Sequence, residues 1–145
     1  MPSDAKIALF FLGDINYDAR CFNMLQTLAN ASHKIDVFHN SNEVNKKENN
    51  QKINIHNLQT KHSSGWLRFY DWFAQIKKIK IGKYQTIIAA DLYSLLGLNS
   101  RNKKTTIIYD VRDFFDEVSA LNNRPFKKMI WGLLEKIQIK QVNTI

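Results

Sequence analysis

The sequence predicts an α/β domain with a doubly wound, mostly parallel sheet and helices on both faces. Short, continuous apolar runs alternate with segments of helical periodicity along all 145 residues. Continuous apolar runs are typical of strands covered on both faces, which is the condition of parallel sheets. The chain has one cysteine and 44% hydrophobic residues, and no apolar run approaches the ~18 residues that cross a bilayer. These observations predict a Rossmann-like fold, and we expect a cytoplasmic protein.

The first half of the chain contains three expected strands. The apolar run 6–12 ends at Gly13 and predicts a buried strand. Apolar residues at helical spacing then predict a helix over 18–31 with Asp18 as its N-cap, because an aspartate side chain accepts hydrogen bonds from first-turn amides. A second strand is expected over 35–38, a polar surface loop over 40–52 and an edge-like strand over 52–58.

The second half repeats the alternation. A helix is expected over 65–81, a buried strand over 86–90, a short helix over 92–98 and another buried strand over 105–109. Pro125 suits the first turn of a helix over 125–139, where a missing amide hydrogen costs nothing. The sequence stops inside a strand-like run at 142–145. We therefore expect residues 1–145 to be the first domain of a longer protein.

The net charge of +8 is concentrated in the middle of the chain. Residues 46–83 hold nine basic and two acidic residues, whereas residues 1–45 hold three basic and five acidic ones. A local basic surface favours a polyanionic partner such as nucleic acid, anionic lipid or a phosphorylated substrate. The base composition of a genome explains a chain rich in Asn, Lys and Ile equally well, so charge alone does not choose a partner.

Candidate binding residues are those that follow the strands, because ligands of open α/β sheets bind beyond the carboxyl ends of strands. The loop after the first strand lacks both the G-x-G-x-x-G and the P-loop patterns, which argues against a nucleotide site there. No catalytic residue can be assigned, and the four histidines lack metal-ligand spacing, so no metal site is expected. The predicted substrate-binding set is Gly13, Asp14, Arg20, Asp91, Arg112 and Asp113.

The two arginines of this set indicate an anionic ligand. Arg20 falls in the first turn of a helix, where the dipole disfavours a cation, so either an anion or a salt bridge to Asp14 or Asp18 explains it. Arg112 belongs to a charge cluster after a strand and presents a planar set of donors to an anionic group. The alternative is that the charges of this cluster pair with each other and hold the loop.

The helix expected from residue 65 carries more aromatic surface than one face needs. Basic residues flank this surface, and such a helix can lie on an anionic membrane. The predicted membrane-facing residues are Trp66, Trp72, Lys77, Lys78 and Lys80. The alternative is a core helix whose extra aromatics contact neighbouring elements or a second domain.

Several segments, taken in order, resemble one protein family. They are Tyr17-Asp-Ala-Arg20, Ala89-Ala-Asp-Leu-Tyr93, Ile108-Tyr-Asp-Val-Arg-Asp113, and Trp131 to Lys136 followed by Val142-Asn-Thr. Their order and spacing resemble the N-terminal domain of the retaining family-4 glycosyltransferases, which have the GT-B fold. Many members of that family have histidine at the position of Arg112, and an arginine there fits charge stabilisation better than proton transfer.

The resemblance implies that residues 1–145 are the acceptor-side domain and that a C-terminal donor-binding domain, absent from this chain, completes the enzyme. Such enzymes transfer a sugar from a nucleotide-sugar to a saccharide acceptor, often lipid-linked, in polysaccharide biosynthesis at the inner face of the membrane. No metal or other cofactor is implied, and the isolated domain would be inactive. Gly13 and Asp14 would line the crevice, Arg20 and Arg112 would meet anionic groups, and Asp113 would orient Arg112 or a sugar hydroxyl.

Two other function classes stay open. One is a non-catalytic flavodoxin- or receiver-like binding module, although the strand over 53–58 ends without the aspartate that a receiver needs. The other is a nucleic-acid-binding domain that uses the basic region 46–83. The sequence has no motif for base recognition, so nucleic acid is the less favoured partner.

Overall fold

The computed structural model describes residues 6–41, 51–98, 105–111, 125–140 and 142. Within these residues, five strands form a single sheet: β1 (Lys6–Phe11), β2 (Lys34–His39), β3 (Ile53–Asn57), β4 (Thr86–Ala89) and β5 (Thr106–Tyr109). Every pair of neighbours is parallel, and the order is β3-β2-β1-β4-β5. The helices are α1 (Ala19–Asn30), α2 (Gly65–Ile76), α3 (Leu92–Gly97) and α4 (Pro125–Ile139), with short 3-10 turns η1 (Ile15–Tyr17) and η2 (Ile81–Lys83).

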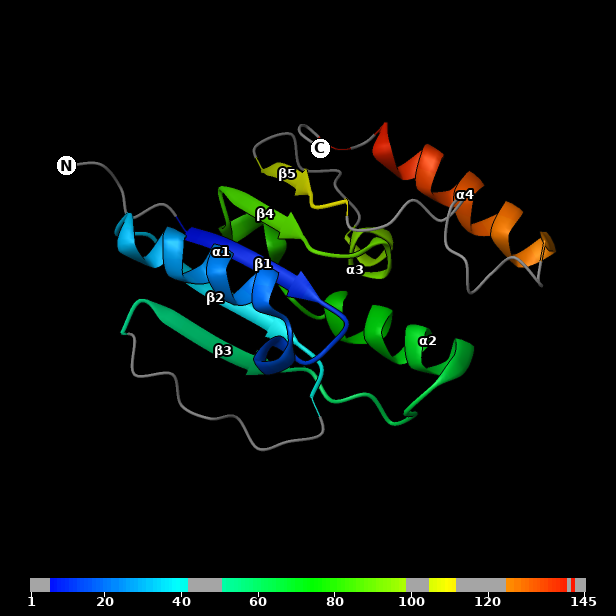
Figure 1. Cartoon of the computed structure of the whole chain (residues 1–145), viewed down its shortest axis with the longest axis horizontal. Helices are drawn as coiled ribbons and strands as arrows, with labels where there is room; N and C mark the ends of the chain where they lie inside the picture. The colour runs from blue at the N-terminus through cyan, green and yellow to red at the C-terminus, as the bar shows by residue number, and fades with distance from the viewer. Residues whose placement is uncertain (1–5, 42–50, 99–104, 112–124, 141, 143–145) are drawn as a thin grey trace.

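Helices cover both faces of the sheet, as the sequence predicts (Figure 1). Side chains of the central strand β1 alternate between two cores. Ile7 and Leu9 pack in the core beneath α1, and Ala8 and Phe10 pack in the core beneath α2, α3 and α4. All four are buried, which explains why this strand reads as a continuous apolar run. The Rossmann-like α/β prediction is confirmed.

The strand order corrects one of the alternatives. The chain runs outward from β1 to β2 and β3 and then crosses to β4 on the other side of β1. This order matches the first five strands of the Rossmann order 3-2-1-4-5-6, whereas flavodoxin- and receiver-like sheets follow 2-1-3-4-5. A flavodoxin- or receiver-like module is therefore the wrong topology for this chain.

Most element boundaries agree with the sequence prediction. Asp18 caps α1, since its Oδ1 accepts a hydrogen bond from the Cys21 amide at 2.8 Å. Helix α2 is shorter than expected, because it ends at Ile76 and the chain continues through turns into η2. Ile79 and Ile81 still pack on the core from those turns, so their helix-like spacing was misleading. Val142 is not in a strand, and the rest of the strand expected over 142–145 lies outside the described residues.

Candidate functional site

A polar cavity of about 300 Å³ lies beyond the carboxyl ends of β1 and β2. Three segments contribute to it: the loop after β1, the residues after β2, and the segment that leads from β3 into α2. This is the edge of a parallel sheet at which ligands bind in α/β proteins. The lining residues are Asp14, Tyr17, Asn40, Ser41, Thr60, Ser63 and Arg68.

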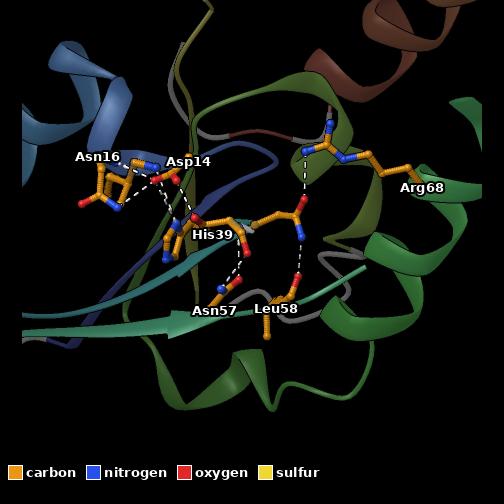
Figure 2. Close-up of polar contacts among 9 residues, drawn as sticks. Asp14, Asn16, His39, Asn57, Leu58 and Arg68 are labelled. Carbon is orange, nitrogen blue, oxygen red and sulfur yellow. Dashed lines mark hydrogen bonds and ion pairs between the residues drawn. The ribbon is translucent and has the colours of Figure 1, made fainter. Parts of the chain in front are cut away.

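Asp14 holds the loop after β1 in place (Figure 2). Its Oδ1 accepts hydrogen bonds from the amide and the side-chain Nδ2 of Asn16, each at 2.9 Å, and its Oδ2 accepts one from the Ser41 hydroxyl. Burial alone would raise the pKa of Asp14, but the bonds from Ser41 and Asn16 outweigh burial and hold the pKa below its ordinary value. Asp14 is therefore an ionised carboxylate that orders the cavity wall.

His39 lies beneath the same loop. It is the last residue of β2, only 1% of it is exposed, and its Nδ1 is 4.0 Å from Asp14 Oδ1. The Ile15 amide points at this nitrogen from 3.5 Å, which is long for a hydrogen bond. A nitrogen that accepts carries no proton, so this contact favours the tautomer with its proton on Nε2.

Asn40 connects three parts of the cavity. Its amide donates to the Gly13 carbonyl at 3.1 Å, and its Nδ2 donates to the Leu58 carbonyl at 2.9 Å. Its Oδ1 accepts from Arg68 Nη2 at 2.8 Å, so its side chain joins the end of β3 to α2, and its backbone amide adds the loop after β1 (Figure 2). These contacts fix both the side-chain amide and the guanidinium that it holds.

Asn57 clamps the segment after β2 from the other side. Its Oδ1 accepts from the Ser41 amide at 3.1 Å, and its Nδ2 donates to the Ser41 carbonyl at 2.8 Å. The backbone of Ser41 is thereby held by both atoms of one amide group. The Ser41 hydroxyl is left to bind Asp14, which ties the two halves of the wall together.

The crevice between β1 and β4, on the other side of the β1 loop, is closed by internal contacts. Asp91 caps α3 by accepting from the Ser94 amide at 2.7 Å, and its Oδ2 accepts from the Leu12 amide at 2.7 Å. Arg20 forms an ion pair with Asp110, the residue that follows β5. A salt bridge was one of the two expectations for Arg20, but its partner is Asp110 rather than Asp14 or Asp18.

The structure thus separates the predicted substrate-binding residues. Asp14 lines the cavity, and Gly13 lies beside it with its carbonyl bonded to the Asn40 amide, whereas Arg20 and Asp91 are not among the lining residues. A Cβ at Gly13 would come within 2.5 Å of the Phe11 ring, so the missing side chain makes room for that ring. Arg112 and Asp113 lie outside the described residues.

Sequence reasoning missed most of the cavity. Asn40 and Ser41 fell in the expected surface loop, although they directly follow β2, and the strand-end rule applied to that strand would have found them. Arg68 was noted only as part of a basic flank. Nothing in the sequence signals that this residue of α2 reaches Asn40, twenty-eight positions away.

The predicted membrane-facing set is wrong for Trp72. This side chain is fully buried, and its Nε1 donates to the Ser94 hydroxyl at 3.3 Å between α2 and α3. For Trp72, the alternative prediction of a core helix is therefore the correct one. Lys77, Lys78 and Lys80 are exposed just after α2 ends.

Trp66 lies at an exposed apolar surface between α2 and α4. It is 55% exposed, and its ring stacks on Trp131 of α4 with centroids 5.2 Å apart. An open apolar groove of about 520 Å³ runs beside this pair. Its walls are formed by Trp66, Leu67, Phe69, Tyr70, Phe73, Leu96, Trp131 and Leu134.

Neither a metal site nor a known family identifies the cavity. Across the described ranges, no three His, Cys, Asp or Glu side chains are grouped so that they could hold a metal ion, and no helix is long and apolar enough to cross a membrane. No protein-family model matches the chain, and no curated protein matches its sequence. The fold and the cavity define the class: a Rossmann-like α/β domain with a polar cavity at the carboxyl ends of its strands.

Proposed function

We propose that this chain is the acceptor-binding domain of a glycosyltransferase, which transfers a sugar from a nucleotide-sugar to a saccharide acceptor in polysaccharide biosynthesis. The observation that carries the proposal is the composition of the cavity. A carboxylate, an amide, hydroxyl groups and a guanidinium line one space of about 300 Å³. Sugar hydroxyls both donate and accept hydrogen bonds, so they suit a wall that mixes acceptors and donors.

In such an enzyme the first domain binds the acceptor and the second domain binds the nucleotide-sugar. The loop after β1 agrees with an acceptor-binding role. This loop has one glycine, whose carbonyl is bonded to Asn40, and its carboxylate Asp14 is ionised. An ionised carboxylate in the cavity wall accepts hydrogen bonds and so favours a hydroxyl-rich ligand. The nucleotide-sugar is assigned to a second domain. Arg112 is proposed to meet its anionic groups, and Asp113 is proposed to orient Arg112 or a sugar hydroxyl.

Titration of the 15N-labelled chain with two kinds of ligand tests this function. Neutral methyl pyranosides should shift the backbone amide signals of Asp14, Asn40 and Ser41, whereas a neutral nucleoside, which presents the base of the donor without its phosphates, should not shift them. Ser63→Ala should weaken saccharide binding, and Ser64→Ala, one position outside the lining, is the matched control. Nucleotide binding without saccharide binding would instead make the chain a nucleotide-binding module and overturn the proposal.

The acceptor is proposed to be lipid-linked, with the α2–α4 surface resting on the inner face of the cytoplasmic membrane. Nine large hydrophobic side chains are exposed within the described residues, and seven of them lie on these two helices. They are Trp66, Leu67, Tyr70, Phe126, Met129, Leu133 and Ile137. Apolar patches of this kind mark interaction sites, and bordering lysines favour an anionic lipid surface.

The charges near this surface support a membrane rather than a second protein domain. Lys77, Lys78, Lys80 and Lys136 are exposed there. The carboxylate of α4, Glu135, is buried against Tyr109 and so does not offset the lysines. Positive charge around an apolar patch strengthens binding to anionic headgroups and weakens with added salt.

Sedimentation with vesicles tests the membrane proposal. The chain should bind vesicles that contain phosphatidylglycerol, bind pure phosphatidylcholine weakly, and be released by salt. Leu67→Glu should reduce binding, while Lys61→Ala, an equally large charge change outside the patch, should reduce it less. Binding to neither lipid would assign the patch to a protein partner, and equal binding to both would show that the lysines do not contribute to membrane binding.

A further inference from the structure

We propose that Arg68 forms an anion-binding subsite in the polar cavity, so that the saccharide bound there carries a phosphate or a carboxylate group. The inference rests on the proposed saccharide-binding function and names the class of saccharide. Three features of the cavity lead to it: an incompletely bonded guanidinium, the positive end of α2 and the rigid support that Asn40 provides.

Arg68 is a partly buried cation whose hydrogen-bonding capacity is mostly unused. A guanidinium has five N–H donors, and within the described part of the chain Arg68 uses one, from Nη2 to Asn40 Oδ1 at 2.8 Å. Its Nε is buried and has no partner among those residues. None of the ion pairs found in the described ranges involves Arg68. A buried donor and an unneutralised charge are both unfavourable until an acceptor with negative charge binds.

The start of α2 adds positive potential at the same place. Ser63 lines the cavity and directly precedes Ser64, the N-cap of this twelve-residue helix. The Ser64 side chain makes no capping hydrogen bond, and the first turn contains no acidic residue. The amides of a helix N-terminus attract anions, and here no side chain of the first turn compensates them. The helix end and the guanidinium therefore favour the same kind of ligand group.

Asn40 prepares the guanidinium for binding. Its Oδ1 accepts from Nη2, and its own Nδ2 is fixed by the Leu58 carbonyl (Figure 2). One N–H of the guanidinium is held, and its other donors make no hydrogen bond within the described residues, so they can pair with a planar or tetrahedral oxyanion. Arginine binds carboxylate and phosphate through paired N–H groups, which a lysine cannot reproduce.

The other arginine within the described ranges does not compete for this role. Arg20 is neutralised by Asp110, and it is not a lining residue of the cavity. Asp14, the acid of the cavity, is bonded to Ser41 and Asn16 and forms no ion pair with Arg68 in the described structure. The cavity thus has a carboxylate wall suited to sugar hydroxyls and a separate guanidinium suited to an oxyanion.

Titration with four probes tests the inference: methyl glucoside, glucuronate, glucose 6-phosphate and inorganic phosphate. The two anionic sugars should bind about tenfold more tightly than methyl glucoside, a typical gain from one charge-assisted contact. They should also shift the Arg68 Nε–H signal in the 15N spectrum of the unmodified chain. Arg68→Ala should remove the tenfold difference, so that this variant binds anionic and neutral sugars with equal affinity. Lys61→Ala, which removes an equal charge next to a lining residue, should preserve the difference.

The outcomes separate this inference from the function on which it rests. Equal affinity for neutral and anionic sugars overturns the inference and leaves the saccharide-binding function standing. Binding of inorganic phosphate alone, lost in Arg68→Ala, supports an anion subsite and overturns the saccharide function. Binding of no probe overturns both. Arg68→Lys keeps the charge without the paired donors, so it provides the same comparison if Arg68→Ala fails to fold.

Discussion

Arg20, in the first turn of α1, pairs with Asp110, the residue that follows β5 and lies ninety positions further along the chain. The pair resolves a local conflict, because a cation in a first turn faces the positive end of the helix dipole and needs a carboxylate nearby. The pair also occupies the Arg20 guanidinium, which the sequence analysis considered as a contact for an anionic ligand. The choice between ligand and salt bridge can be tested separately from the fold.

Arg20→Ala should lower the free energy of unfolding by about 1 kcal/mol and leave saccharide binding unchanged. The Arg20 side chain is 56% exposed, so water screens the pair, but the Asp110 side chain is only 10% exposed and would lose its cation. Urea denaturation measures the effect. With Asp110→Asn, the double variant should be less destabilised than the sum of the two single variants. If Arg20→Ala lost saccharide affinity at unchanged stability, Arg20 would be a residue of the binding site.

Two tryptophans of α2 should respond in opposite ways to substitution. Trp72→Phe should lower the free energy of unfolding by about 1–2 kcal/mol, because it removes the bond to Ser94 and leaves space in a filled core. Vesicle binding should not change. Trp66→Ala should cost less stability, because Trp66 is 55% exposed, and should weaken binding to anionic vesicles.

Thermal denaturation and vesicle sedimentation of the same two samples provide the comparison. A loss of vesicle binding in Trp72→Phe with unchanged stability would contradict the buried position of Trp72. The paired result also separates packing from surface contact within one helix, because the sequence analysis predicted that both tryptophans face a membrane.

The fold could be predicted because local patterns determine it. Buried parallel strands read as apolar runs, and the Asp18 cap marks the start of α1, since both signals depend on residues close in sequence. The site depended on contacts that local patterns do not contain. Arg68 contacts Asn40 only after β3 and α2 have packed. Arg20 pairs with Asp110 and not with Asp14 or Asp18, which are nearer to it in the sequence. Trp72 and Trp66 share a helix, but packing against α3 decides which one is buried.

Asp36 should make the chain less stable in acid. Burial alone would raise the pKa of Asp36, but hydrogen bonds from Tyr84 and Asn54 and the charges of Lys83 and His56 outweigh it and hold the pKa below its ordinary value. A carboxyl whose pKa is lower in the folded state stabilises the fold above the ordinary pKa. That contribution is lost as the pH falls from the ordinary pKa through the folded one.

Urea midpoints measured from neutral pH down to about pH 3 should therefore fall more steeply for the native chain than for Asp36→Asn. In the native chain the Tyr84 hydroxyl donates a hydrogen bond to Asp36 Oδ2 at 2.5 Å, and the side-chain oxygen of the asparagine can still accept this bond. Asp71→Asn provides a second comparison, because hydrogen bonds from His62 likewise hold the pKa of Asp71 below its ordinary value. Parallel slopes for the native chain and Asp36→Asn would show that other acids govern the acid transition.

Tyr109 and Glu135 should make α4 sensitive to alkali. Burial and the hydrogen bond to Glu135, at 2.8 Å, raise the pKa of the Tyr109 hydroxyl above its ordinary value of 10.0. A group whose pKa is raised by folding stabilises the fold below its ordinary pKa, and this contribution is lost as the pH rises through the folded pKa. Between about pH 9 and pH 11 the native chain should therefore lose stability faster than Tyr109→Phe, which has no hydroxyl to ionise.

Glu135→Ala gives the complementary result at neutral pH. It leaves a buried hydroxyl without its acceptor, so the free energy of unfolding should fall by about 1–3 kcal/mol, whereas Glu135→Gln keeps an acceptor and should cost less. Hydrogen exchange of the α4 amides shows where the loss occurs, because Glu135 and Trp131 are the two large side chains that α4 buries. Faster exchange confined to α4 is the expected result, and unchanged exchange in both variants would mean that Trp131 alone anchors this helix.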